Sequence, residues 1–119
     1  MNTDERQVLV TSWLTMQRNW WAFEELHRQL KNEPQEGWLT LLCLIEAAEG
    51  PEMLETIGAG PLEDLLRSHA EGFITSVEFE AAKNSKLRIS LSHVWVRHKD
   101  HEITRRLVAL GCQLIAEPA

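Results

Sequence analysis

Three proline-containing breaks divide this chain into short segments, and they constrain its fold more than any other feature. The breaks are Glu33-Pro34, Gly50-Pro51 and Gly58-Ala59-Gly60-Pro61. Proline lacks a backbone donor and fixes φ, so it disturbs a helix interior but suits the first helical position. We therefore expect helices to end before each break and to begin again at it.

The segments between the breaks have the apolar periodicity of helices. The longest predicts one helix over residues 4–31, with Asn2 and Glu5 at capping-box spacing. Further helices are expected over 34–49, after Pro51, after Pro61, around Gly72 and after Asp100. The apolar seam of the first helix consists of Leu9, Trp13, Met16, Trp20, Phe23, His27 and Leu30.

Residues 85–98 fit two structures. Leu87, Ile89 and Leu91 alternate with polar residues, which is typical of a strand. Leu87, Leu91 and later apolar residues also fit a helix capped by Ser85. We favour the helix, because a lone strand would have no pairing partner in this chain.

These elements predict an all-α fold for the single domain 1–119. We expect a compact bundle of about six to seven helices, packed antiparallel or orthogonally, or as stacked helix pairs. The chain has the length of one domain and a globular balance of 44% hydrophobic and 25% charged residues. No apolar run approaches the roughly 20 residues that span a bilayer, and the N-terminus lacks the features of a secretory signal.

Two cysteines, Cys43 and Cys112, fall within apolar helical patterns. We interpret them as buried, reduced thiols, which favours a cytoplasmic location.

The net charge of −6 conceals a strong asymmetry along the chain. Residues 33–80 contain eleven acids and one base, Arg67, whereas residues 83–106 contain seven bases and two acids. An acidic segment repels nucleic acid and attracts basic proteins. The alternative is that these acids only populate solvated helix faces.

The stretch Ile57-Gly58-Ala59-Gly60-Pro61-Leu62-Glu63-Asp64-Leu65-Leu66, followed by His69, resembles the hallmark of a widespread bacterial family of unknown function. Glu33-Pro34-Gln35-Glu36-Gly37-Trp38, and Leu87-Arg88 leading to Val94-Trp95, are similar to that family as well. The resemblance covers about residues 20–96, and the chain departs from it at Ala70 and Ser85. It implies a compact helical domain and no assigned catalytic residue.

The central motif also has a structural interpretation. Gly58 could end a helix in the left-handed conformation, Gly60 could permit a close backbone approach, and Pro61 would begin the next helix. Glu63 and Asp64 would then stabilise the positive N-terminal end of that helix. The functional alternative is that this acidic pair receives an Arg or Lys side chain of a partner.

Chemical sites are weakly indicated. His98 and His101 have a spacing that suits two metal ligands, and His93 and Glu102 are near, but no cysteine or second carboxylate completes the set. His69 with Glu63 could serve acid–base chemistry in a small hydrolase, yet no nucleophile motif accompanies them. We therefore expect no enzyme activity, no cofactor and no metal.

Large aromatic residues suggest a second kind of interface. Most of the five tryptophans lie in apolar stripes, whereas Trp21 and Phe79 are harder to bury and could anchor a homodimer. The C-terminal bases lack interleaved aromatic residues, so we do not expect nucleic acid as a partner. The lack of a bilayer-spanning apolar run argues against a membrane as well.

These patterns favour a small acidic inhibitor of the immunity-protein or antitoxin kind, which would neutralise a basic partner such as a nuclease toxin. The alternatives are a self-associating structural or regulatory module and, less favoured, the hydrolase. The predicted partner-binding residues are Glu46, Glu49, Glu52, Glu55, Glu63, Asp64, Trp21 and Phe79.

Overall fold

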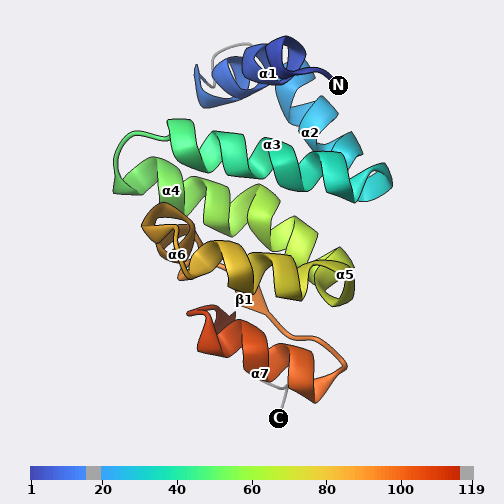
Figure 1. The fold of residues 1–119 in the computed structure, drawn as a ribbon, viewed down its shortest axis with the longest axis vertical. Helices are drawn as coiled ribbons and strands as arrows, with labels where there is room; N and C mark the ends of the chain where they lie inside the picture. The colour runs from blue at the N-terminus through green and yellow to red at the C-terminus, as the bar shows by residue number, and fades with distance from the viewer. Residues whose placement is uncertain (16–19, 116–119) are drawn as a thin grey trace.

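The computed structural model describes residues 1–15 and 20–115, and these form an all-α stack of helices with one small pair of strands (Figure 1). The stack runs from α1 at one end to α7 at the other along the 42 Å dimension. The elements are α1 Thr3–Thr15, α2 Trp20–Asn32, α3 Pro34–Ala47, α4 Pro51–Ile57, the π-helix η1 Gly58–Leu62, α5 Glu63–Ala81, α6 Ser85–Leu91, β1 Trp95–Val96, α7 His101–Ala109 and β2 Gln113–Leu114.

The single helix expected over 4–31 is wrong, because α1 and α2 are separate helices that pack on each other. The periodic seam is confirmed in part. Leu9, Trp13 and Leu30 are buried, whereas Trp20 is 75% exposed and His27 is exposed as well. Two shorter helices let both halves of the seam enter one core, which a single straight rod could not do. Met16 of the seam lies outside the described residues.

The starts of α1, α3 and α4 were predicted correctly from a capping box and two prolines. Asn2 Oδ1 accepts the Glu5 backbone N–H at 2.8 Å, and Glu5 Oε1 accepts the Asn2 N–H at 3.1 Å, which completes the capping box. Pro34 and Pro51 each begin a helix, and Gly50 has the positive φ of 84° that the turn between α3 and α4 requires.

The expected break at residues 58–61 is wrong. The chain continues from α4 through the π-helix η1 into α5 without leaving helical conformation. Gly58 has φ −63° and ψ −48°, which is a right-handed helical conformation, so it does not end the helix as expected. A π turn adds one residue to the helical ladder, and it accommodates Pro61 inside the helix.

The close backbone approach expected at Gly60 occurs at Gly58. A Cβ built on Gly58 would lie 2.0 Å from the Ser90 carbonyl oxygen of α6. The same construction on Gly60 meets no atom within 4 Å. Helix α6 therefore crosses η1 directly over the bare backbone of Gly58.

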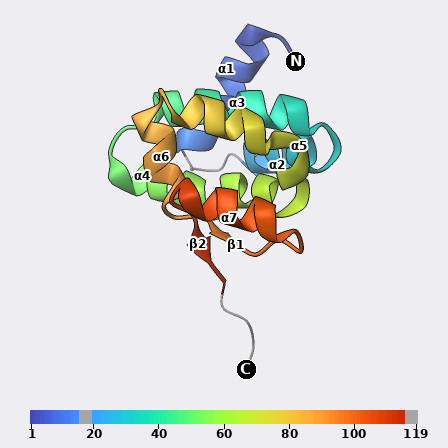
Figure 2. The ribbon, with the colours of Figure 1, turned by 60° about the horizontal axis from the view of Figure 1, so that its bottom comes forward.

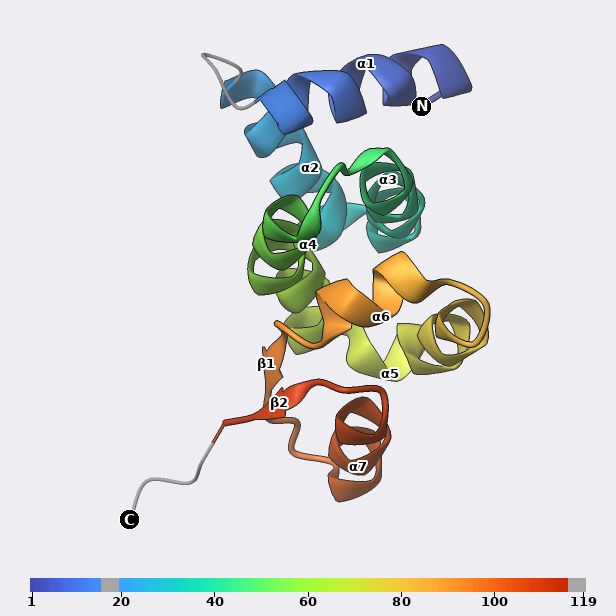
Figure 3. The same cartoon turned by 90° about the vertical axis from the view of Figure 1, so that its left-hand side faces the viewer.

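Helix α5 bends at His69, whose φ of −133° and ψ of 22° are not helical. The first half continues the line of α4, and the second half turns back beneath α3 (Figures 1 and 3). The two helical stretches expected after Pro61 and around Gly72 are thus the halves of one bent helix.

The helix favoured for residues 85–98 is confirmed over Ser85–Leu91, and the stretch Leu87–Leu91 whose alternation suggested a strand is helical. Helix α6 comes first, and its cap is Asn84 rather than Ser85, because Asn84 Oδ1 accepts the Leu87 N–H at 3.0 Å. Strand β1 follows and pairs in parallel with β2, beside α7 (Figure 2). The objection that a strand would lack a partner was wrong, because Trp95 pairs with Gln113 and Val96 with Leu114.

One continuous core joins the helices. Its largest fully buried side chains are Leu9, Leu26, Leu41, Leu44, Ile45, Ile57, Leu62, Leu65, Leu66, Leu87, Leu91 and Leu107. Among the described residues, no helix combines the length and the apolar character that a membrane crossing requires.

Candidate functional site

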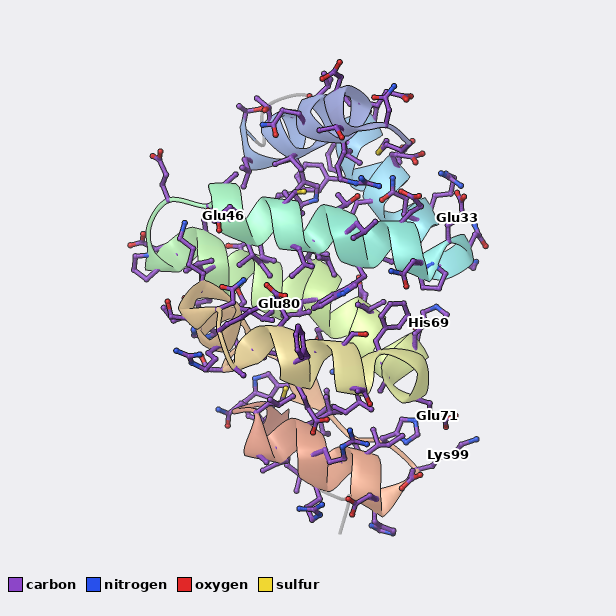
Figure 4. The ribbon with its side chains drawn as sticks, in the orientation of Figure 1. Glu33, Glu46, His69, Glu71, Glu80 and Lys99 are labelled. Carbon is purple, nitrogen blue, oxygen red and sulfur yellow. The ribbon has the colours of Figure 1, made fainter. Side chains whose placement is uncertain are left out.

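Four of the predicted acidic residues gather where α3 gives way to α4. Glu46 lies near the end of α3, Glu49 in the connection, and Glu52 and Glu55 on α4. All four are exposed, and none forms an ion pair with a described residue. We call these four glutamates the acidic surface; Figure 4 shows Glu46 at the opposite edge of the molecule from Glu33 and His69.

Most other acids between residues 33 and 80 are held by bases within the molecule. Glu36 pairs with Arg6, Glu78 with Arg106, and Glu80 with Lys83 at 3.7 Å. Glu33 pairs with Arg28, and Glu71 lies 3.5 Å from His98. The C-terminal bases thus neutralise part of the acidic segment. Its acids without an ion pair to a described residue are the four of the acidic surface and Asp64.

One base stands at the edge of the acidic surface. Lys86 Nζ donates hydrogen bonds to the backbone carbonyl oxygens of Glu46 at 2.8 Å and Ala48 at 3.1 Å. The ammonium group therefore satisfies carbonyls at the C-terminal end of α3, where a positive charge also stabilises the helix dipole. The carboxylates themselves stay available to a partner.

Glu63 has a structural role. Its Oε1 accepts the Trp95 backbone N–H at 2.7 Å, and its Oε2 lies 3.5 Å from Arg67 Nη2. Arg67 Nε in turn donates to the Trp95 carbonyl oxygen at 3.2 Å. Glu63 and Arg67 of α5 therefore bind the backbone N–H and carbonyl of Trp95 and hold β1 in place. Only 15% of the Glu63 side chain is exposed, so Glu63 is not part of the acidic surface.

Asp64 lies apart from the other predicted acids, in a hollow between α2 and α5. His27, Lys31, Ser68 and His69 line the same hollow. The hollow walls exclude water from part of the Asp64 carboxylate, and this burial raises its pKa, although the nearby His27 opposes the shift. In the sequence, His27 lies on an apolar seam and His69 follows a leucine pair. No local pattern indicated that both would line one hollow with Asp64.

The two aromatic residues predicted as anchors are exposed, Trp21 by 46% and Phe79 by 69%. Trp21 lines a shallow hollow with Met1 and Glu5 of the N-terminal end, whereas Lys83 Nζ lies 4.7 Å from the centre of the Phe79 ring. They belong to α2 and to the second half of α5. Self-association through them stays a prediction.

The histidines considered as metal ligands do not form a metal site. His98 Nδ1 accepts the Asp100 N–H at 2.9 Å, and the His98 backbone is tied to Thr104 at 3.1 Å and 3.0 Å. These bonds fix the turn that precedes α7. Within residues 1–15 and 20–115, no group of three or more His, Cys, Asp or Glu side chains is placed to hold an ion.

The cysteines differ in environment. Both are free thiols, but only Cys112 is buried, and burial raises the pKa of its thiol to about 12. Cys43 is exposed, contrary to expectation, because it lies on the outer side of α3. An apolar sequence pattern does not distinguish this side from the side that faces the core.

The fold and these surfaces define a small all-α protein that carries an acidic surface and, apart from it, a hollow lined by histidines. The chain belongs to a family of unknown function, DUF6869, whose family model matches residues 12–113. No curated protein and no solved structure matches the chain.

Proposed function

We propose that this protein binds and neutralises a basic protein partner, as an immunity protein or antitoxin does, in the cytoplasm of a bacterium. The observation that carries this proposal is the set of four exposed glutamates without an ion pair among the described residues, in a segment whose other acids are mostly paired. Catalysis is not part of the proposal.

Electrostatic complementarity supports this kind of function. A patch of like charges costs stability through self-repulsion, and it raises the rate of encounter with a surface of opposite charge. The active site of a nuclease is cationic because it binds phosphate, so an acidic surface can compete for it. Glu52 and Glu55 are three residues apart on α4, so both carboxylates lie on one face of that helix.

The test uses nuclease inhibition and charge reversal. A panel of small basic ribonucleases is assayed on RNA with the wild-type protein, with Glu52→Lys/Glu55→Lys, and with Asp4→Lys/Glu24→Lys. The control pair is exposed, also lies outside the ion pairs among the described residues, and changes the net charge by the same amount.

We expect the wild-type protein to inhibit at least one enzyme, more strongly at low salt, and the double reversal on the acidic surface to weaken inhibition at least about tenfold. The control variant Asp4→Lys/Glu24→Lys should inhibit the same enzyme as strongly as the wild type does. Equal weakening by both pairs would mean that only net charge matters, and inhibition of no panel member by the wild type would contradict the nuclease-directed form of the proposal.

A further inference from the structure

A continuous groove runs along α2 on the side that faces η1 and the first half of α5. It consists of two hollows of about 390 and 480 Å³, which share His27, Leu30 and Asp64 as lining residues. We call it the α2–α5 groove. Its size suits a small organic molecule.

One end of the groove is apolar and aromatic. Trp13, Phe23 and Leu26 line it on one side and Pro61 on the other. The rings of Trp13 and Phe23 are 5.2 Å apart and tilted by 47°, so they form a preorganised aromatic wall. This end can accept a flat ring or an alkyl group.

The other end is polar and includes side chains that can donate hydrogen bonds to an anion. Lys31, His27 and His69 line it together with Ser68 and Asp64. Past Ser68 and His69 it opens into a further hollow, where the labelled side chains of His69, Glu71 and Lys99 lie along one edge of the molecule (Figure 4). Lys31 and Lys99 line the two polar hollows together with the carboxylates Asp64 and Glu71, and Arg67 also lies there but pairs with Glu63.

Gly60 keeps the apolar end open. Neither its φ nor its surroundings require glycine, because its φ is not positive and an added Cβ would meet nothing within 4 Å. Glycine within a helix is less favourable than alanine, because it loses more backbone freedom on folding. Since Gly60 lines the groove, the space that a side chain would occupy there is space that a ligand can occupy.

The backbone is irregular at both ends of the segment that borders the groove. The π-helix η1 contributes Gly60 and Pro61, and the bend in α5 occurs at His69. Such departures from α-helical geometry often occur at functional sites. Here they give the groove its concave wall.

We propose that the α2–α5 groove binds a small organic anion, with an apolar body between Phe23 and Pro61 and a carboxylate or phosphate near Lys31 and His69. This site is separate from the acidic surface, and it goes beyond the proposed neutralising function.

The test uses three probes with the same ring system: 2-naphthoate, 2-naphthyl phosphate and the neutral 2-naphthylmethanol. A ligand of this size should bind with a Kd of about 1 mM. Binding is measured by amide chemical-shift changes in the full chain, which also report whether each variant is folded.

The blocking variant is Gly60→Leu, and its matched control is Ala59→Leu, at an exposed residue of the same π-helix that does not line the groove. We expect Gly60→Leu to weaken the anionic probes at least about tenfold and Ala59→Leu to leave them unchanged. A second variant, Lys31→Glu, should weaken the two anions at least about fivefold and leave the alcohol unaffected.

Several outcomes would overturn the proposal. One is that none of the probes saturates the protein at millimolar concentration. Another is that Gly60→Leu and Ala59→Leu weaken probe binding equally. A third is that the chemical-shift changes occur at amides outside the groove. Binding of the alcohol as tight as that of the anions would reject the anionic head group. Preference for one anion would decide between carboxylate and phosphate.

Discussion

At the scale of single residues, the two glycines of the central motif, Gly58 and Gly60, lie in different surroundings, so glycine is present at each for a different physical reason. Gly58 is needed by the fold, because the Ser90 carbonyl of α6 occupies the position that a Cβ would take. Gly60 has open space in front of it and lines the groove. Spacing alone does not distinguish the two, because both precede Pro61 in the same short stretch.

Alanine at the two positions should therefore have opposite effects on stability. Gly58→Ala forces α6 away from η1, so we expect it to lower the free energy of unfolding by about 1–3 kcal/mol, as overpacked cores do. Gly60→Ala should leave stability unchanged or raise it by up to about 1 kcal/mol, because it removes a flexible residue from a helix. Urea denaturation of both variants measures the difference. A Gly58→Ala variant as stable as the wild type would show that α6 and η1 can separate without cost.

At the scale of elements, β1 has few means of staying in place on its own. It has two residues, and its pairing with β2 is equally short. The side chains of Glu63 and Arg67 add a second attachment through the polar groups of Trp95. The two acids of this pair thus have different roles: Glu63 holds the strand, and Asp64 lines the groove.

Removing the Glu63 carboxylate should loosen this attachment. We expect Glu63→Ala to lower the free energy of unfolding by about 1.5–3 kcal/mol, the usual contribution of a hydrogen bond to a charged group. Glu63→Gln keeps an acceptor oxygen and should lose less. Hydrogen exchange provides a local readout, in which the Trp95 amide should exchange faster in Glu63→Ala than in Glu63→Gln. Unchanged protection of that amide would refute the role assigned to Glu63.

At the scale of the whole molecule, α7 is joined to the stack partly by charge. Arg106 of α7 donates hydrogen bonds to both carboxylate oxygens of Glu78 on α5. This guanidinium holds the pKa of the Glu78 carboxyl below its usual range. A carboxyl whose pKa is lowered by folding stabilises the folded state above its unfolded pKa, and this contribution disappears as pH falls through the folded pKa.

The melting temperature should show this dependence. Glu78→Gln is expected to melt below the wild type at neutral pH, and the two curves should converge as the solution becomes acidic. Glu102→Gln is the matched control, since the pKa of Glu102 is lowered by Arg105 on the same helix and its loss leaves the contact between α5 and α7 intact. If the melting temperatures of the wild type and Glu78→Gln differed by the same amount at all pH values, the Glu78–Arg106 ion pair would not be the cause of that difference.

The sequence predicted the all-α class and several helix starts, because caps and prolines act locally. It could not predict that the seam from Leu9 to Leu30 belongs to two helices, since a continuous apolar period is compatible with either arrangement. It also missed the pairing of Trp95 with Gln113, because a strand pair separated by a helix has no local signal. His27, Asp64 and His69 likewise line one hollow only because α2 and α5 pack together, and a local sequence pattern does not reveal this packing.

The position of α1 in the core has a practical consequence for recombinant work. The family match begins at residue 12 and ends at 113, inside α1 and inside β2. An expression fragment cut at those limits would discard Leu9 and Val10, which are almost fully buried, together with half of the second strand. Fragments for crystallisation or binding screens should therefore retain the capping residue Asn2 at one end and Ile115 at the other, whose amide bonds to Val96.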